Sequence, residues 1–273
     1  MIADARPPAA AEATPGLASS VSPATILDDL AAGRVRAAEP DPTVAGGWRV
    51  RPEVKAAILA CFSDPTAASW DVGPFMFRDR AALVPIDPGA GRRIVPGGTA
   101  IRAGAHLEPG VVVMPPSYVN VGAWIGADTM VDSHVLVGSC AQIGVGVHLA
   151  AGVTIGGVLE PPGARPVIVE DGAFVGAGSR LLDGVLVRRR AVIGAGVILT
   201  GTSRLYDLVE ERELQGTIDE PLVVPPDVVV VPGSRPLSGP WAEARGLSVS
   251  TAVIVKRRDA GTAARVALEE ALR

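Results

Sequence analysis

The chain has 273 residues, of which 48% are hydrophobic and only 4% are aromatic. This length allows a substantial core, and the composition predicts that Val, Ile, Leu and Ala fill it. The formal net charge of -4 and the pI near 5.5 argue against nucleic acid as the principal partner, because phosphate binding requires a basic face.

The cysteine content and the hydropathy favour a cytoplasmic protein. Cys61 and Cys140 are the only cysteines, and they lie far apart in the sequence. No run of about eighteen apolar residues occurs, so we expect no membrane span. The first residues, MIADARPPAAAEATPG, lack a basic segment followed by a continuous apolar one and do not resemble a signal peptide. We therefore expect a cytoplasmic location with reduced thiols.

The N-terminal part of the chain predicts a tail followed by a small helical domain. Residues 1–20 are rich in Ala and Pro and are expected to be disordered. Residues 22–32, SPATILDDLAA, combine a Ser cap, a Pro in the first turn and apolar residues at helical spacing. Residues 51–64, RPEVKAAILACFSD, predict a second helix. The helical domain spans residues 21–87.

A period of six residues dominates the centre of the chain. A large aliphatic residue recurs without a miss from Ile101 to Ile155, and the count restarts at Val169 and runs to Leu199. The positions are Ile101, Leu107, Val113, Val119, Ile125, Val131, Val137, Ile143, Leu149 and Ile155, then Val169, Val175, Leu181, Val187, Ile193 and Leu199. Neither a period of 3.6 nor a strict alternation survives this length, whereas a hexapeptide-repeat β-helix predicts it.

Each six-residue unit also has a small or β-branched residue two positions before the large aliphatic one, as Ala123 stands before Ile125 and Ser179 before Leu181. Residues two apart on a strand share a face, so both side chains should point inward. Glycines at the remaining positions favour sharp turns. Three such strands would form one triangular coil.

Two interruptions and a C-terminal extension complete the predicted architecture. The β-helix should span residues 88–234, with a Pro- and Gly-rich loop at 156–166 and a polar excursion at 200–222. Within it, PLVVPPDVVVVPG predicts one more coil. Residues 235–273 form the extension, in which LSVSTAVIVKRRD predicts a strand and AARVALEEALR a helix.

Three segments of the β-helix carry a family resemblance. The motifs MPPSYVN, VGSCAQIG and GGVLEPP, followed by VIVEDGAFVGAGSR and by TAVIVKRRDAGT, resemble the tetrahydrodipicolinate N-succinyltransferases. The resemblance covers roughly residues 85–273. It implies a left-handed parallel β-helix, so that the fold class is mainly β with a small α-helical N-terminal domain and a short strand and helix at the C-terminus.

The resemblance also implies an activity and an assembly. Members use succinyl-coenzyme A as a co-substrate to acylate the amine of an opened, hydrated tetrahydrodipicolinate, with no tightly bound cofactor. The expected partners are these small molecules and two further copies of the chain, with active sites between the subunits of a homotrimer. With three His, two Cys and no paired ligand spacing, a metal site is not expected.

Two site residues follow from the resemblance. The acidic residue of the family's MVD motif falls on Asp132, which would assist deprotonation of the amine as it attacks the thioester. The alternative is a turn residue that hydrogen-bonds to the backbone. The substrate-binding arginine of the family falls on Arg93, and Arg suits bidentate capture of a carboxylate. An isolated arginine is more often a solvated surface residue.

The resemblance places the acyl donor along a groove between coils. Backbone groups of Ala141, Gly156 and Gly157 are the candidate lining of this groove. Lys256 and Arg257 match the family's VKK segment and are candidates for binding the phosphates of coenzyme A. A solvated basic surface is the alternative for these two cations.

Two residues depart from the family pattern. Where the family has Ala-Arg-Ser-Glu, with a catalytic glutamate, this chain has Ala177-Gly178-Ser179-Arg180. His134 stands where the family commonly has tryptophan, and on one strand it would share a face with Asp132. His134 is either a base near neutral pH or a surface residue.

The departures leave three interpretations open. Arg180 restores a carboxylate-binding charge from a shifted position, or the enzyme is a paralogous N-acyltransferase for another amino-acid-like amine, in a specialised pathway and with a succinyl or acetyl donor. The third interpretation is a hexapeptide-repeat scaffold without turnover.

Overall fold

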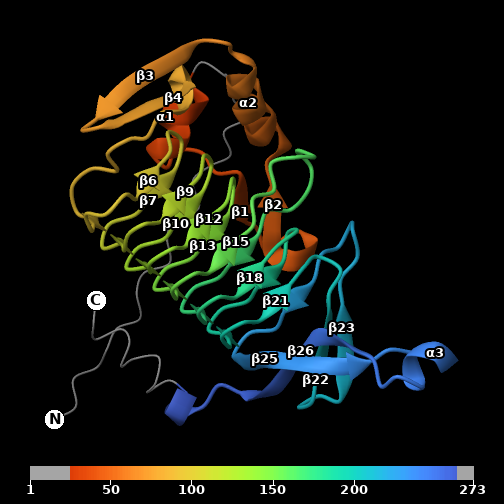
Figure 1. Cartoon of the computed structure of the whole chain (residues 1–273). Coiled ribbons are helices and arrows are strands. Elements are labelled where there is room, and N and C mark those ends of the chain that lie inside the picture. Colours follow the sequence, from red (N-terminus) through yellow and green to blue (C-terminus); the bar gives the residue numbers. More distant parts are fainter. Residues whose placement is uncertain (1–24, 263–273) are drawn as a thin grey trace.

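The computed structural model describes residues 25–262 of the chain. The centre of the molecule is a three-sided prism of parallel strands (Figure 1). The N-terminal helices and the β3–β4 hairpin (residues 67–80) lie at one end, the β1–β2 hairpin (residues 38–50) lies along its side, and long C-terminal strands lie at the other end. The predicted mainly-β fold, a left-handed parallel β-helix, is confirmed.

Three sheets form the sides of the prism, and we call them face 1, face 2 and face 3. Face 1 contains β7 (His106–Leu107), β10 (Trp124–Ile125), β13 (Gln142–Ile143), β16 (Ile168–Val169), β19 (Leu186–Val187) and β24 (Val223–Val224). Face 2 contains β5 (Arg93–Ile94), β8 (Val112–Val113), β11 (Met130–Val131), β14 (His148–Leu149), β17 (Phe174–Val175), β20 (Val192–Ile193) and β25 (Val228–Pro236). Face 3 contains β6 (Ala100–Ile101), β9 (Tyr118–Val119), β12 (Leu136–Val137), β15 (Thr154–Ile155), β18 (Arg180–Leu181) and β21 (Ile198–Leu199).

The six-residue period sets the register of every face. Strands pair with the strand one coil earlier, so that Ile125 lies beside Leu107 on one side and Ile143 on the other. The large aliphatic residues from Ile101 to Leu199 are all buried, as are the small residues two positions before them from Ala105 onward. Both predicted sets of inward-facing residues are therefore confirmed. Burial of this aliphatic column supplies the main stabilising term of the prism.

Three hydroxyl side chains inside the prism tie successive coils together in the same way. The Ser117 Oγ donates to the carbonyl of Asp132 at 2.9 Å and accepts from the Val135 N–H at 3.1 Å. Thr129 and Ser179 repeat the pattern with Gly144 and Gly194 as acceptors. A buried hydroxyl needs such partners. Here Ser117 and Ser179 fix turns that follow face 2, and Thr129 fixes a turn that follows face 1.

The corners of the prism use a left-handed residue in each turn. Positive φ recurs at six-residue spacing, mostly at glycine, but also at Asp128 (φ 57°), His134 (φ 61°) and Cys140 (φ 64°). Glycine adopts this conformation without steric penalty, whereas other residues reach it at a cost of about 1 kcal/mol. The turns therefore explain the glycine pattern of the sequence.

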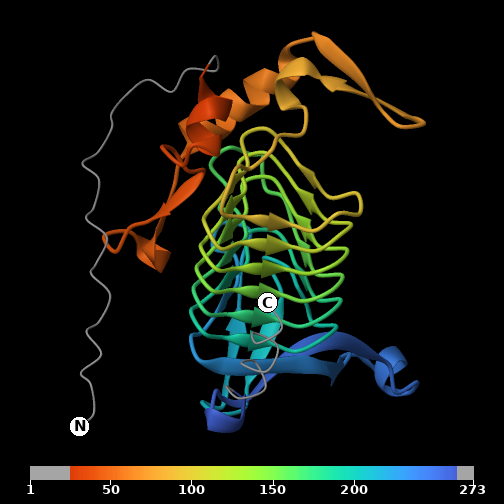
Figure 2. The same ribbon diagram turned by 90° about the vertical axis from the view of Figure 1, so that its left-hand side faces the viewer.

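The N-terminal domain contains both predicted helices and two hairpins that were not predicted. The helices are α1 (Ile26–Ala31) and α2 (Pro52–Ser63). The hairpins are β1 (Ala38–Pro40) with β2 (Trp48–Val50), and β3 (Ala67–Val72) with β4 (Phe75–Arg80). Short 3-10 turns lie at Ala45–Gly47 and Ala81–Leu83. The domain is therefore not purely helical. In Figure 2 the orange β3–β4 hairpin extends beyond the prism.

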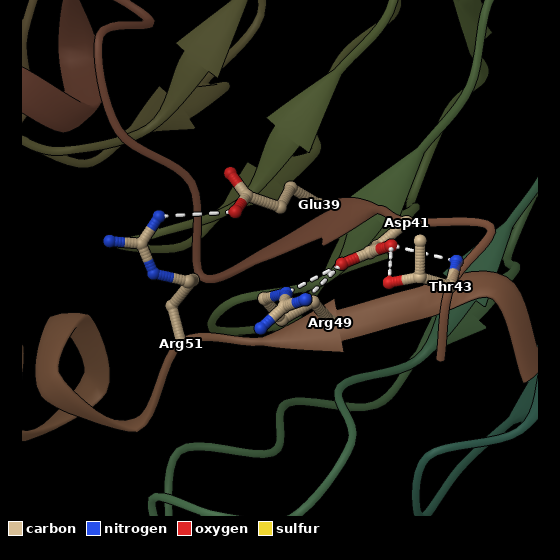
Figure 3. Close-up of polar contacts among 5 residues, drawn as sticks. All are labelled: Glu39, Asp41, Thr43, Arg49 and Arg51. Carbon is tan, nitrogen blue, oxygen red and sulfur yellow. Dashed lines mark hydrogen bonds and ion pairs between the residues drawn. The ribbon is translucent and has the colours of Figure 1, made fainter. Parts of the chain in front are cut away.

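The β1–β2 hairpin is held by a network of ion pairs. Asp41 accepts from the backbone and hydroxyl of Thr43 at 2.8 and 2.6 Å and from Arg49 at 2.6 Å, and Arg51 pairs with Glu39 at 3.2 Å (Figure 3). These contacts lower the pKa of Asp41 to about 2, chiefly through the hydrogen bonds from Thr43. They hold the two strands of the hairpin together.

The same hairpin docks on face 1 of the prism. The Trp48 indole donates to Glu170 at 3.0 Å, and Arg36 donates to Gln142 at 2.9 Å while lying over the Trp124 ring. Burial lowers the pKa of Arg36 to about 10. Face 1 is thus covered by the N-terminal domain of its own chain.

Two segments leave the coils of the prism, and a C-terminal extension follows it. Residues 156–166 leave the prism as a loop, and residues 200–222 contain the hairpin of β22 (Arg204–Asp207) and β23 (Arg212–Gln215). The predicted extra coil is formed by β24 and β25. The predicted C-terminal strand is β26 (Ser248–Arg257), which pairs with β25 and follows the short helix α3 (Pro240–Glu243).

The chain ends fall partly outside the described residues. The predicted tail at 1–20 and the predicted terminal helix at 263–273 lie there. Because β25 continues to Pro236, the last strand of the prism and the C-terminal extension form one sheet. No helix within residues 25–262 is both long and apolar enough to cross a membrane.

Candidate active site

Asp132 lies at the corner between face 2 and face 3, immediately after β11. Its backbone is fixed on both sides, because its N–H donates to Leu149 at 2.9 Å and its carbonyl accepts from Ser117 at 2.9 Å. Its Oδ1 accepts from the Ser133 N–H at 2.6 Å, whereas its Oδ2 has no hydrogen-bond donor within residues 25–262. One carboxylate oxygen is therefore anchored to the turn and the other can receive a proton from a ligand.

His134 occupies the same turn. Its φ of 61° lies in the left-handed region, its N–H donates to the carbonyl of Pro116 at 2.8 Å, and its side chain is exposed. The prediction that Asp132 and His134 share one face of a strand is wrong, because β11 ends at Val131 and the chain bends through both residues. Their relative orientation is set by the turn.

Arg93 lies on face 2, at the end of the prism nearest the N-terminal domain. In β5 it pairs with Val112 of β8, which pairs in turn with Met130 of β11. Its side chain is exposed on the outer surface. Adjacent strands are about 4.8 Å apart, so Arg93 is two strands, or about 10 Å, from Met130. Arg93 and Asp132 thus border the same part of face 2.

Arg180 lies on face 3, beyond the corner that carries Asp132. It begins β18 and pairs with Thr154 of β15, which pairs with Leu136 of β12. Its side chain is exposed, and no hydrogen bond or ion pair to another residue of the described chain engages it. Arg180 is therefore two strands, or about 10 Å, further along the prism than Leu136, the first residue of the strand that follows Asp132 and His134.

Gly156 and Gly157 lie at the next corner, between face 3 and face 1. A Cβ on Gly138 would lie 2.2 Å from the Gly157 nitrogen, so the loop and the preceding coil approach each other at backbone distance. The Gly156 N–H donates to the carbonyl of Leu181 at 2.8 Å. The Gly157 N–H donates to no acceptor within the described part of the chain. Gly157 thus presents an available backbone donor.

Ala141 does not share this availability. Its side chain is fully buried in the prism, its N–H donates to Gly138 at 3.2 Å, and its carbonyl accepts from Trp124 at 2.9 Å. Its side chain points inward, as expected for the residue two before each large aliphatic, and the backbone of Ala141 remains a candidate lining that offers the acyl donor no unengaged N–H.

Lys256 and Arg257 lie at the end of β26, near the C-terminal end of the prism. Lys256 pairs with Asp259 at 2.6 Å and Arg257 with Glu210 at 2.5 Å. The Lys256 ammonium helps to hold the pKa of Asp259 well below its usual range. Each cation is exposed, and a phosphate would have to compete with the carboxylate beside it.

Comparison with known proteins decides the family. The 2,3,4,5-tetrahydropyridine-2,6-dicarboxylate N-succinyltransferase of Idiomarina loihiensis is 42% identical over 257 residues, which cover 91% of this chain and 87% of that relative. The chain belongs to the tetrahydrodipicolinate N-succinyltransferase family. The same enzyme of Polynucleobacter asymbioticus is 41% identical over 258 residues, with 91% and 87% covered. A profile described as hexapeptide repeat of succinyl-transferase matches residues 166–201.

A solved structure of a putative 2,3,4,5-tetrahydropyridine-2-carboxylate N-succinyltransferase from Campylobacter jejuni is 17% identical to the chain. The superposition covers 86% of this chain and 63% of that chain, with a TM-score of 0.47. The two relatives described above confirm the predicted family and the predicted acyltransferase class.

The sequence analysis missed one buried lysine that contacts the loop at 156–166 of this succinyltransferase. Lys55 is fully buried, and its Nζ donates to the carbonyl of Ala164 at 2.7 Å in the loop at 156–166. The signal was present, because Lys55 stands three residues before the apolar Ile58 in a predicted helix, and residues three apart lie on the same side of a helix. A lysine on the apolar face of a helix is rarely fully buried without a partner.

A cavity of about 570 Å³ separates the loop at 156–166 from the turn that follows β23. Its lining includes Gly157, Glu160, Arg165, Asp183 and Asp219. Arg165 closes its base by donating to the carbonyls of Gly184 and Pro221 at 2.8 and 2.7 Å, and burial lowers the pKa of this arginine to about 10. The loop is thereby fixed to the prism at its C-terminal end.

Metal and thiol chemistry find little support in the described part of the chain. No group of three or more His, Cys, Asp and Glu side chains within residues 25–262 is placed to hold a metal ion. Cys140 is fully buried, and burial raises the pKa of its thiol to about 12. Its thiol is therefore protonated at neutral pH and is not a nucleophile.

Proposed function

We propose that this protein transfers the succinyl group of succinyl-coenzyme A to the amine of hydrated, ring-opened tetrahydrodipicolinate, a step of lysine and diaminopimelate biosynthesis. The names of its relatives at 41–42% identity support this reaction. The acidic group at the corner of the prism, with arginines on either side of it, supplies the chemistry that the reaction requires.

The proposed chemistry is a direct aminolysis of a thioester. The acceptor amine attacks the thioester carbonyl carbon, a C–N bond forms, and the carbonyl oxygen takes the negative charge. Asp132 accepts the proton that the amine must lose, the C–S bond then breaks, and the proton passes to the departing thiolate of coenzyme A. The free Oδ2 of Asp132 is the acceptor in this step.

Charged and backbone donors would position the two substrates. Arg93 and Arg180 are exposed guanidinium groups that suit bidentate binding of the carboxylates of the acceptor and of the succinyl group. The unengaged N–H of Gly157 suits the thioester oxyanion or an amide of the pantetheine arm. Lys256 and Arg257 remain candidates for the phosphates of coenzyme A. His134, exposed in the Asp132 turn, is the remaining candidate for contact with the acceptor.

The separation of these groups supports a site between chains. Asp132 lies at the corner between faces 2 and 3, and Gly157 at the corner between faces 3 and 1, so the full width of face 3 lies between them. One chain cannot bring the two residues to one thioester. We therefore propose a homotrimer in which the Asp132 corner of one chain meets the Gly157 corner of its neighbour.

The proposed reaction is tested by release of free thiol. The purified protein is incubated with succinyl-coenzyme A and tetrahydrodipicolinate, and thiol release is compared with controls that lack either substrate. Release that depends on both substrates supports the proposal. Release no greater than in the control without acceptor would remove tetrahydrodipicolinate as the substrate.

Arg180 favours a second candidate function. Where the family has a catalytic glutamate, this chain presents an exposed cation. A paralogous N-acyltransferase that acts on another amino-acid-like amine is consistent with this change. A screen of amines against succinyl- and acetyl-coenzyme A separates the two, because the second candidate requires an acceptor that is turned over faster than tetrahydrodipicolinate. A non-catalytic scaffold would release no thiol with any pair.

We also propose a cytoplasmic location, which fits a biosynthetic enzyme whose two cysteines, Cys61 and Cys140, are both buried thiols. Alkylation of these thiols in denaturant, in extracts prepared without reductant, tests the reduced state that this location requires.

A further inference from the structure

Lys55 is the most deeply buried cation of the N-terminal domain. It lies in α2 with its side chain fully excluded from solvent, among the buried Val54, Ile58 and Cys61 of the same helix. Burial lowers the pKa of Lys55 below its usual value. Burying an ammonium group is costly unless hydrogen bonds replace its water, so its partners are structurally important.

The partners of Lys55 are backbone carbonyls of the loop at 156–166. Its Nζ donates to Ala164 at 2.7 Å and reaches Pro161 at 3.5 Å, residues 109 and 106 positions away in sequence. The Ala164 N–H also donates to the Pro161 carbonyl at 2.9 Å, which closes a turn at the tip of the loop. Lys55 therefore binds both carbonyls of this turn from the N-terminal domain.

Lys55 has no anionic partner that would give it another role. Cys140 lies close enough to interact electrostatically, but burial keeps its thiol protonated by raising its pKa to about 12. Within residues 25–262, the ion pairs of α2 and its cap involve Arg51, not Lys55. The hydrogen bonds of Lys55 are thus directed to the loop alone.

Three contacts together define the shape of the loop. Near its start, the Val158 N–H donates to Ser139 at 3.2 Å, and a Cβ on Gly157 would meet the Ser139 nitrogen at 2.8 Å. At its end, Arg165 is tied to the prism. Lys55 holds the tip between these two points. In Figure 1 the green loop after β15 reaches toward α2, in agreement with this contact.

We propose that Lys55 is a positioning residue for the acyl donor, and that it acts by holding the loop at 156–166 in the shape that presents Gly157 to the donor. This inference rests on the proposed function, in which Gly157 contacts the thioester or the pantetheine arm. Without the ammonium, the Ala164 carbonyl loses its donor and the tip of the loop loses its tie to the N-terminal domain. The chemical step at Asp132 does not involve Lys55.

The test compares Lys55→Met with a matched control. Met keeps the length and apolar stem of the side chain and removes only the donors, whereas Arg51→Met removes a cation of α2's cap that does not touch the loop. We expect Lys55→Met to raise the KM for succinyl-coenzyme A about tenfold, with kcat within about twofold of wild type. Backbone amides of residues 157–164 should exchange hydrogen faster in Lys55→Met than in wild type. Their exchange rates should be unchanged in Arg51→Met.

A second variant keeps the inference testable if Lys55→Met folds poorly. Deletion of residues 160–164 removes both acceptor carbonyls, and we expect a KM increase at least as large as that of Lys55→Met. Introducing Lys55→Met into the shortened chain should then add no further change in KM. Independent, additive effects would overturn the proposal, as would an unchanged KM in a folded Lys55→Met protein.

Hydrogen exchange separates this inference from the proposed reaction. If wild type shows no turnover with succinyl-coenzyme A, the proposed function fails, and binding of coenzyme A measured by calorimetry replaces KM as the readout. Weaker coenzyme A binding together with faster loop exchange in Lys55→Met supports the positioning role. Faster exchange with unchanged binding overturns it, because Lys55 would then stabilise the loop without serving the donor.

Discussion

Asp132 and Gly157 lie at neighbouring corners of one prism and are separated by the full width of the face that contains β12 and β15. A carboxylate at one corner and a free backbone donor at the next can serve the same thioester only if two prisms stand side by side. If the proposed reaction uses both groups, activity should depend on the proposed trimer.

Mixed trimers test this condition. Asp132→Asn and Gly157→Val should each be inactive, the latter because a side chain would press on the Ser139 backbone. When equal amounts of the two chains assemble at random, about a quarter of the sites between chains combine an intact Asp132 with an intact Gly157, so about a quarter of wild-type activity should return. Thiol release from co-expressed chains measures this. Mixtures with no recovered activity would show that both residues come from one chain.

The carboxylate of Asp132 should contribute to the chemical step and little to binding. Asp132→Asn retains the Oδ1 hydrogen bond to Ser133 but cannot accept the amine proton. We expect kcat to fall by about 100-fold or more, with both KM values within about threefold. Steady-state kinetics of thiol release measures the change, and His134→Ala in the same turn is the comparison. A similar fall in kcat in His134→Ala would indicate that the His134 imidazole, and not Asp132, is the base.

Arg180 should bind a carboxylate of the acceptor. Because its guanidinium is exposed on face 3 and engages no other residue of the described chain, removing it should leave stability unchanged. Arg180→Ala should raise the KM for the acceptor about tenfold and leave that for succinyl-coenzyme A unchanged, in line with a lost charged hydrogen bond of about 1.5 kcal/mol. Arg78→Ala, on the exposed β4, is the control. A change in the KM for the acyl donor alone would assign Arg180 to the succinyl group.

The buried thiol of Cys140 should make stability depend on alkaline pH. Burial raises its pKa from 9.0 in the unfolded chain to about 12 in the folded one. Between these values the unfolded thiol loses its proton and the folded one keeps it, so the thiol's contribution is complete below pH 9 and is lost as pH rises toward 12. The free energy of unfolding of wild type should fall relative to Cys140→Ala by roughly 1.4 kcal/mol per pH unit.

Urea denaturation of both proteins between pH 8 and 11 measures this difference. Both proteins contain Lys55 and Cys61. Subtracting the free energy of unfolding of the variant from that of wild type therefore cancels the contribution of these two groups to first order. Ser139→Ala, a change next to Cys140, is the control, and the pH dependence of its free energy of unfolding should match that of wild type. Equal pH profiles for wild type and Cys140→Ala would show that the folded thiol titrates normally.

The local architecture was predictable because the prism repeats a local rule. A large aliphatic side chain at every sixth residue points into the prism, as Ile125 and Ile143 do. This local period predicts the fold without any information about contacts between distant residues. The same repeat places the Ala141 side chain inward. The resemblance assigned the acidic residue of the MVD motif to Asp132, one residue after the inward-facing Val131, and the structure adds the two backbone contacts that fix it at a corner.

The hairpins of the N-terminal domain were not predictable in the same way. Residues 38–50 form a short segment with two prolines and a pair of glycines. They form β1 and β2, and Trp48 of this segment and the nearby Arg36 dock on face 1. A two-stranded hairpin is marginal in isolation and depends on such packing. The β-propensity of these segments alone is too weak to reveal it.

By itself, the sequence determined the prism, its register and the corner that carries Asp132, because these follow from a six-residue period that each coil satisfies locally. Only the tertiary structure decided which distant groups meet. The hydrogen bond from Lys55 to Ala164 spans 109 residues, and the distance between the Asp132 and Gly157 corners depends on how three strands close a triangle. Contacts of this kind arise from the packing of separate elements, which leaves no periodic trace in the chain.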